Sequence, residues 1–295
     1  MLDKVLWDEL ARECGQFGRH PKYLPNQGNA GDALIAAGTW QFFDDLGMQP
    51  KLCGRRSVQA GDTVIYAGGG NLVPEYNNCA RFLERCLKVG VKRALVLPHS
   101  VVGHVDLLAQ LDQRFIIVCR EKASVERVLA TGTGARVLEA PDMALRLDVD
   151  ALRERCSGWS FGADLATHLV LHGKVAAYLR WQTKLKTLVP RRGEHVSIIR
   201  ADVEAKAGVS GDPRWDLSSL YGSKFRSRSE SDQVALDLID FLSSVKSVQT
   251  NRLHVGVAAM LVGVSVRYLD NSYGKIRAVY DASMTGIPGV SFVSS

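Results

Sequence analysis

The sequence predicts an α/β protein with two Rossmann-like domains that face a cleft. Short apolar runs alternate with helical patterns, as expected of buried parallel strands joined by helices. Polar and glycine-rich clusters follow several of those runs, at the sheet edge where such folds bind ligands. The chain has 295 residues, which is too long for one ordinary core and suits two domains.

The expected elements follow from that alternation, because helices show apolar residues at helical spacing and buried strands are short apolar runs. In the first half we expect, in order, a helix over 32–46, a strand over 63–67, a helix over 75–89, strands over 94–98 and 115–119, a helix over 122–130 and a strand over 136–140. The second half gives a strand over 195–199, a helix over 233–243, a strand over 247–249, a helix within 255–263, a strand over 265–269 and a helix over 275–282. We therefore expect an N-terminal domain over 1–160, a basic amphipathic linker over 161–193 and a C-terminal domain over 194–295.

Composition excludes several classes of protein. A hydrophobic fraction of 46% is ample for globular folding, and no apolar stretch approaches the roughly 18 residues that cross a bilayer. The start is acidic and amphipathic, unlike a secretory signal, so we expect a cytoplasmic protein. Six cysteines without a C-x-x-C pair argue against a zinc site or a disulfide framework and predict reduced, mostly buried side chains.

The net charge of +6 comes from one segment, because residues 165–193 hold six basic side chains and no acidic ones. Within 174–189 the apolar residues, Tyr178 and Trp181 among them, fall on one helical face. That stripe fits an interfacial helix over 169–192 on the inner face of an anionic membrane, or an interdomain helix packed on protein. We favour the second, since most amphipathic helices bury their stripe in their own protein. No nucleic-acid motif is present, so no nucleic-acid partner is expected.

The most informative motif is Thr-Asn-Arg-Leu-His-Val-Gly at 250–256. It places a guanidinium and an imidazole two residues apart at the start of an apolar helix, with Asn251 as the expected N-cap. A helix N-terminus attracts phosphate or carboxylate, Arg252 can bind such an anion with two parallel hydrogen bonds, and His254 can move a proton. The alternative is a capped core helix with two incidental polar residues.

Other polar clusters follow strands or begin helices. Arg120 and Arg200 come directly after strands, and with Arg252 they would suit a small ligand with two anionic groups. Lys275, at the start of the last helix, can add a cation, although each position also fits an ordinary surface residue. The glycine-rich turns and strand ends add further cleft candidates: Asn29, Asp32, Gly69, Gly70, Asn71, His99 and Ser100. Neither G-x-G-x-x-G nor G-x-x-x-x-G-K occurs, so nicotinamide binding and ATP hydrolysis have no direct support.

Taken in chain order, these motifs resemble the polysaccharide pyruvyl transferase family. The resemblance extends from about residue 25 to about residue 285 and rests on Gly28-Asn-Ala-Gly-Asp32, Gly68-Gly-Gly-Asn71, Leu97-Pro-His-Ser100, Arg120-Glu-Lys-Ala-Ser124, Asp142-Met-Ala144, Thr250-Asn-Arg-Leu-His254 and Asp270-Asn-Ser-Tyr-Gly-Lys275. It implies a GT-B-like fold and transfer of pyruvate from phosphoenolpyruvate onto two hydroxyls of a saccharide as a cyclic ketal, in exopolysaccharide or cell-surface glycan synthesis. It implies no metal and no cofactor, and an acceptor that is either free or lipid-linked.

The resemblance also implies roles for particular residues. His254 is the expected acid/base, and the residues expected to bind phosphoenolpyruvate are Arg252, Arg120, Arg200, Lys275, Asn251 and Leu253. His99 departs from the family pattern, where Gln is common, and the second domain has few strands. Two alternatives stay open: a GT-B glycosyltransferase that uses a nucleotide sugar, and a non-catalytic module that binds an anionic ligand.

Overall fold

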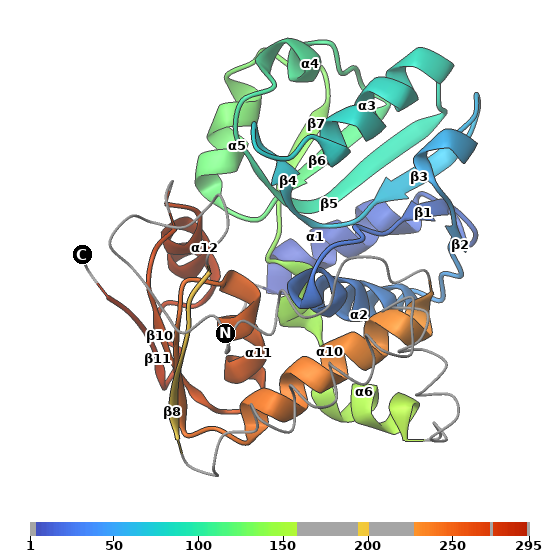
Figure 1. The fold of residues 1–295 in the computed structure, drawn as a ribbon. Helices are drawn as coiled ribbons and strands as arrows, with labels where there is room; N and C mark the ends of the chain where they lie inside the picture. The colour runs from blue at the N-terminus through green and yellow to red at the C-terminus, as the bar shows by residue number, and fades with distance from the viewer. Residues whose placement is uncertain (1–3, 158–193, 201–226, 272–273, 294–295) are drawn as a thin grey trace, which may run out of the picture. The chain divides into compact units, whose positions relative to one another are not determined.

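The computed structural model describes residues 4–157, 194–200, 227–271 and 274–293. The chain forms two compact units: unit 1 comprises 1–26 and 39–146, and unit 2 comprises 27–38 and 147–295. Each unit contains a parallel sheet with helices between its strands (Figure 1), which confirms the predicted α/β class with two Rossmann-like sheets. This division places the boundary earlier than residue 160 and assigns 27–38 to the second unit, whereas the predicted linker lies outside the described residues.

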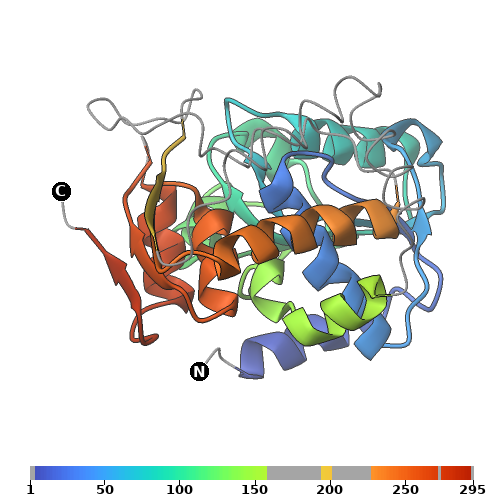
Figure 2. The ribbon, with the colours of Figure 1, turned by 60° about the horizontal axis from the view of Figure 1, so that its bottom comes forward.

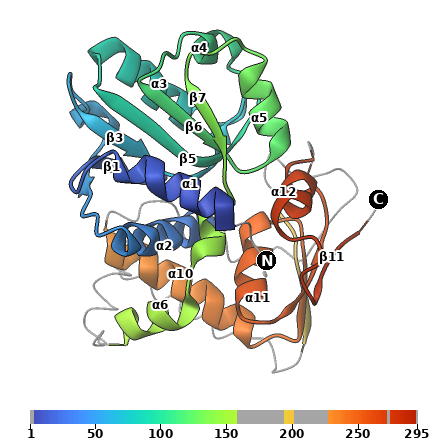
Figure 3. The ribbon, with the colours of Figure 1, turned by 180° about the vertical axis from the view of Figure 1, so that it is seen from behind.

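In unit 1 the described strands form a parallel sheet in the order β2-β1-β3-β5-β6-β7, with β4 beside β5. Their bounds are β1 Lys22–Leu24, β2 Lys51–Leu52, β3 Thr63–Tyr66, β4 Gly69–Leu72, β5 Arg93–Val101, β6 Phe115–Cys119 and β7 Arg136–Glu139. Figure 3 shows β5, β6 and β7 side by side. The four strands predicted for this half are confirmed, whereas β1, β2 and β4 were missed. The first two are too short to show a pattern, and β4 begins with two glycines.

Burial explains why β5 and β6 lie at the centre of this sheet. Every residue of β6 is buried, as are all residues of β5 after Arg93, so both faces of these strands are covered. Leu95 of β5 pairs with Ile116 of β6 in register. All six cysteines of the chain are free and five are buried, as predicted from their scatter.

The helices of unit 1 are α1 Lys4–Gly15, α3 Asn78–Val89, α4 Val105–Ala109 and α5 Lys122–Leu129, with 3-10 turns at Arg55–Ser57 and Met143–Arg146. The next helix after α1, α2 (Ala30–Asp45), begins in residues assigned to unit 2 and ends in residues assigned to unit 1. Helix α3 ends at Gly90, whose φ of 71° is left-handed and therefore favours glycine. Helices α1 and α4 were not predicted, whereas α2, α3 and α5 begin and end within a few residues of their predicted bounds.

Unit 2 has a smaller parallel sheet, whose described strands run in the order β11-β10-β9-β8. The strands are β8 His195–Ile198, β9 Ser247–Thr250, β10 Ser265–Tyr268 and β11 Val290–Phe292, and the helices are α6 Val149–Cys156, α10 Arg228–Ser243, α11 Leu253–Leu261 and α12 Lys275–Ser283. Figure 2 shows α10 alongside α6. Helix α10 begins five residues earlier than predicted, because the hydroxyl of Ser227 accepts a hydrogen bond from the amide of Glu230 and caps it.

Candidate functional site

The turn between β9 and α11 carries the central motif and is fixed by Thr250. Its buried hydroxyl donates to the carbonyl of Ile198 at 2.6 Å and accepts from the amide of Arg252 at 3.0 Å. The first bond ties the ends of β8 and β9 together. The second sets the direction in which the chain leaves β9, so Thr250 determines where α11 begins.

Asn251 is not the N-cap of α11, contrary to prediction. Arg252 occupies that position, with extended backbone angles, and Asn251 precedes it. The Oδ1 atom of Asn251 instead accepts a hydrogen bond from the amide of Arg200 at 2.7 Å. The asparagine side chain therefore joins the segment after β8 to the segment after β9, and it brings the backbone of Arg200 next to the central motif.

A buried tyrosine holds the first turn of α11. The hydroxyl of Tyr268, at the end of β10, donates to the carbonyl of Leu253 at 3.0 Å. Its ring lies against Gly256, where an added Cβ would come within 2.2 Å of the ring. Only glycine lets the ring approach α11 so closely. The strand next to β9 thus fixes the helix that carries His254.

The glycine-rich loop over 28–31, which runs into the first turn of α2, lies against His254. A Cβ added at Gly31 would be 2.9 Å from both Cβ and Nδ1 of His254, and 3.0 Å from Oδ1 of Asn29. The loop is itself a capping box, because Oδ1 of Asn29 accepts from the amide of Gly31 and Oδ2 of Asp32 accepts from the amide of Asn29. The motif therefore caps the start of α2, and the same loop lies beside the imidazole.

The segment after β10 begins α12. Oδ1 of Asn271 accepts from the amide of Lys275 at 2.9 Å, and Oδ1 of Asp270 accepts from the amide of Arg277 at 3.4 Å. Asn271 is buried, whereas Lys275 is partly exposed at the start of the helix. Because β9 and β10 are parallel neighbours, this segment and the central motif lie at the same edge of the sheet.

The predicted residues of unit 1 form a second cluster, at the carboxyl ends of β5 and β6. Arg120 is 1% exposed, and its Nη1 donates to Oδ2 of Asp142 at 2.5 Å while its Nε donates to the hydroxyl of Ser100 at 2.9 Å. Ser100 in turn donates to Glu121 at 3.0 Å. Burial raises the pKa of Glu121, and the charge of Arg120 partly opposes this shift. Arg120 thus forms a buried ion pair with Asp142.

His99 and Asn71 belong to the same cluster. The amide nitrogen of Asn71 lies 3.1 Å from Nε2 of His99, and its side-chain nitrogen donates to Oδ1 of Asn26 at 2.8 Å. Gly69 pairs with His99 in register, and its φ of 142° is in the range that favours glycine. Gly70 lies next to it in β4, so the glycine-rich turn continues directly into a strand. His99 is fully buried, which makes it part of this interior network.

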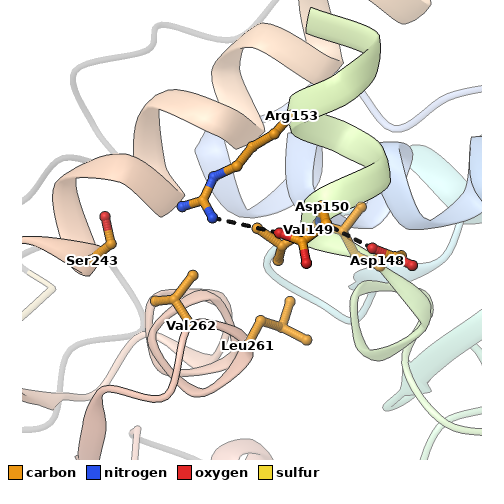
Figure 4. A pocket seen from close by; sticks show the side chains of 8 residues that line it. Asp148, Val149, Asp150, Arg153, Ser243, Leu261 and Val262 are labelled. Atoms are coloured by element: carbon orange, nitrogen blue, oxygen red, sulfur yellow. Dashed lines mark hydrogen bonds and ion pairs between the residues drawn. The ribbon is translucent and has the colours of Figure 1, made fainter. Parts of the chain in front are cut away.

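A cavity of about 430 Å³ lies elsewhere in unit 2 (Figure 4). Its lining includes Asp148, Asp150 and Arg153 from the start of α6, together with Leu261 and Val262 from the end of α11. Arg153 pairs with Asp150 at 3.8 Å. The cavity lies at the opposite end of α11 from His254, so it does not contain the central motif.

The structure thus brings the predicted residues together in two groups. The group in unit 2 comprises Asn29, Asp32, Arg200, Asn251, Arg252, Leu253, His254 and Lys275, and the group in unit 1 comprises Gly69, Gly70, Asn71, His99, Ser100 and Arg120. Contributors that were not predicted as site residues include Gly31, Asp142, Tyr268 and Asn271. Three of them occur within motifs that the sequence made visible, but Tyr268 gave no signal beyond an apolar strand.

Fold and site together define a class. The protein is an α/β protein with two Rossmann-like units, in which polar side chains gather at the carboxyl ends of parallel strands. A solved structure from Klebsiella pneumoniae subsp. pneumoniae, described as functionally uncharacterized, has the same fold: the TM-score is 0.77 at 22% identity, over 99% of this chain and 100% of that one. Among the described residues, no helix combines the length and apolar character needed to cross a membrane.

The chain belongs to the polysaccharide pyruvyl transferase family, whose model matches residues 29–273. It is also 26% identical over 290 residues to EpsO of Bacillus subtilis (strain 168), a candidate pyruvyl transferase. That similarity covers 91% of this chain and 86% of EpsO. The family model's matched range, 29–273, includes every predicted residue of the two groups except Lys275.

Proposed function

We propose that this protein transfers pyruvate from phosphoenolpyruvate onto two hydroxyls of a saccharide, forming a cyclic ketal during exopolysaccharide or cell-surface glycan synthesis. The observation that carries the proposal is the position of His254. His254 lies in the first turn of α11, two residues after the N-cap Arg252, and the loop at Gly31 packs against its Nδ1 atom. An anion-binding helix start and a proton carrier therefore lie within one turn of each other.

The chemistry needs both groups. Protonation of the methylene carbon of phosphoenolpyruvate creates cationic character at the adjacent carbon, which a sugar hydroxyl attacks. Loss of phosphate then allows a second hydroxyl of the same sugar to attack, which closes the ketal. The two attacking hydroxyls release two protons. One restores to the acid the proton that it gave to the methylene carbon, and the other leaves with phosphate or passes to solvent. His254 supplies and accepts these protons, because imidazole exchanges protons readily near neutral pH.

Positive charge stabilises the donor and the departing phosphate. Arg252 and the N-terminus of α11 bind the phosphate, because guanidinium pairs with phosphate through two hydrogen bonds and the helix dipole adds to the attraction. The other residues of unit 2 that were predicted to contact phosphoenolpyruvate lie in the same turn or in the segments after β8 and β10. They are Arg200, Lys275, Asn251 and Leu253.

The residues of unit 1 have a different place in the proposal. Arg120 is engaged with Asp142 inside its own unit, so we assign it to shaping the loops that follow β5 and β6. Those loops, with Asn71, His99 and Ser100, are proposed to contact the acceptor. The GT-B-like cleft stays a prediction, as does a membrane contact through 169–192, which lies outside the described residues.

The proposal is tested with the variant His254→Ala and the matched control His20→Ala. His20 is exposed, and its Nδ1 lies 3.1 Å from the backbone carbonyl oxygen of Gln49. Both variants and the wild type are incubated with phosphoenolpyruvate and candidate saccharides. The assay records acceptor-dependent phosphate release and a mass gain of one pyruvate less one water. We expect the control to retain activity and His254→Ala to lose about a hundredfold to ten-thousandfold in rate.

A thermal-shift screen separates this function from its nearest alternative. Phosphoenolpyruvate should stabilise the wild-type protein, because a ligand that binds only the folded state raises the melting temperature. A glycosyltransferase that uses a nucleotide sugar would instead be stabilised by nucleoside diphosphates. Wild-type activity in His254→Ala, or a shift with nucleoside diphosphates alone, would reject the proposal.

A further inference from the structure

Two buried asparagine side chains in unit 2 have amide nitrogens with no hydrogen-bond partner among the described residues. Asn251 is 0% exposed and Asn271 is 3% exposed, and the Nδ2 atom of each is buried. Folded proteins pair nearly all buried polar groups, so such atoms call for an explanation. A ligand that brings oxygen atoms to this place would supply the missing acceptors.

The orientation of both amides is fixed by their other atom. Oδ1 of Asn251 accepts from the backbone amide of Arg200 at 2.7 Å, and Oδ1 of Asn271 accepts from the backbone amide of Lys275 at 2.9 Å. A backbone N–H can only donate, so exchanging oxygen and nitrogen would set two donors against each other. The unpartnered atoms are therefore NH₂ groups, which can only bind acceptors.

The two amides lie at one edge of one sheet. Asn251 directly follows β9 and Asn271 comes shortly after β10, and these parallel strands are neighbours in register from Ser265↔Ser247 to Tyr268↔Thr250. Asn251 directly precedes the N-cap of α11, and Oδ1 of Asn271 accepts from the first backbone amide of α12. Each of these helices has nine residues. The partial positive charge at each helix N-terminus adds to the attraction for an anion at this edge of the sheet.

We propose that the amides of Asn251 and Asn271 bind the carboxylate of the donor, while Arg252 binds its phosphate. This inference rests on the proposed function and adds a second anion subsite to it. Phosphate carries the greater charge and must depart, which suits a charged guanidinium at a helix start. The carboxylate carries one charge over two oxygens and stays on the product, which suits two neutral, immobile donors shielded from water.

The subsite also explains how a donor would be selected. A ligand with phosphate alone satisfies Arg252 and leaves both amides without acceptors, and unsatisfied buried donors are a strong source of discrimination. A ligand that carries a carboxylate next to its phosphate satisfies all three. The structure thus favours small phosphorylated carboxylic acids over sugar phosphates and nucleotides.

The test compares two probes on the full-length protein by titration calorimetry: phosphoenolpyruvate and methyl phosphate, which lacks the carboxylate. Asn251→Asp and Asn271→Asp keep the accepting oxygen and replace the NH₂ group with a repelling oxygen. The matched control is Asn77→Asp, an exposed position at the start of α3 with no side-chain cap bond. We expect the two aspartate variants to bind phosphoenolpyruvate about tenfold more weakly or worse, with methyl phosphate affinity nearly unchanged.

Thermal melts show whether each variant folds. Asn251→Ser and Asn271→Ser remove the amide without adding charge, and they replace any aspartate variant that unfolds. Unchanged phosphoenolpyruvate affinity in the folded variants would overturn the inference and leave the proposed function intact. Equal weakening of both probes would also overturn it, because the amides would then serve the phosphate. A wild-type protein that binds no phosphoenolpyruvate would overturn the proposed function itself.

Discussion

Adding one methyl group at Gly31 should move His254 and slow the reaction. In Gly31→Ala the new Cβ would sit 2.9 Å from both Cβ and Nδ1 of His254. Carbon atoms in contact prefer about 3.5 to 4.0 Å, so the imidazole must shift by roughly 0.5 to 1 Å. Proton transfer needs a hydrogen-bond distance, and a misplacement of about 1 Å can cost about a hundredfold in rate. We therefore expect kcat to fall about tenfold to a hundredfold.

Stability should change little in the same variant. Gly31 is the second residue of α2, and alanine is favoured over glycine within a helix by up to about 1 kcal/mol, which offsets part of the clash. The matched control is Gly15→Ala at the end of α1, where an added Cβ meets nothing within 4 Å. Phosphate release gives kcat and KM, and thermal melts report folding. If Gly31→Ala folded normally and kept the wild-type kcat, the inferred contact between the loop and the imidazole would be wrong.

Three further predictions concern neighbouring groups. Arg252→Lys keeps the charge but loses the planar guanidinium that forms two parallel hydrogen bonds, so calorimetry should show about tenfold weaker binding of phosphoenolpyruvate. Equal affinity would count against the proposed role of Arg252. Tyr268→Phe removes the hydrogen bond to the carbonyl of Leu253, which should lower the free energy of unfolding by about 1 kcal/mol. Because the first turn of α11 loosens, kcat should also fall. An unchanged melting temperature and kcat would contradict this. The pKa of Glu121 is raised, chiefly by burial, so the folded state holds its proton more tightly than the unfolded chain. Its contribution to stability is therefore complete below the unfolded pKa of about 4.3 and is lost as pH rises through the higher folded pKa. Glu121→Gln, which is always neutral, should lose less melting temperature than the wild type between about pH 4 and pH 7, and identical pH profiles would refute this reading.

The reliability of the sequence predictions depended on how local each signal was. Strands β5 and β6 were predicted correctly because a continuous apolar run is a local property that only a doubly buried strand requires. The short strands β1 and β2 gave no such run, and their pairing depends on β3, which lies far along the chain. Helix α10 was placed too late, because the polar residues of its first turn were taken for part of the preceding loop.

The candidate site shows the same division. The motif at 250–256 correctly indicated a helix that begins beside an arginine and a histidine, since spacing alone determines that arrangement. Its cap was misassigned, because Asn251 accepts a hydrogen bond from the backbone of Arg200, in the segment after β8, and does not cap its own helix. A side chain that can satisfy either partner gives no sequence signal for its choice.

The sequence by itself determined the α/β class, the positions of the central strands along the chain, the family, and the placement of Arg252 and His254 at a helix start. These depend on apolar run length and residue spacing, which are written along the chain. Only the tertiary structure decided that Gly31 packs against His254, that Arg120 is buried against Asp142, and that Asn251 and Asn271 share one sheet edge. Those contacts join residues far apart in the chain, and they arise from which strands pair and how closely two backbones approach.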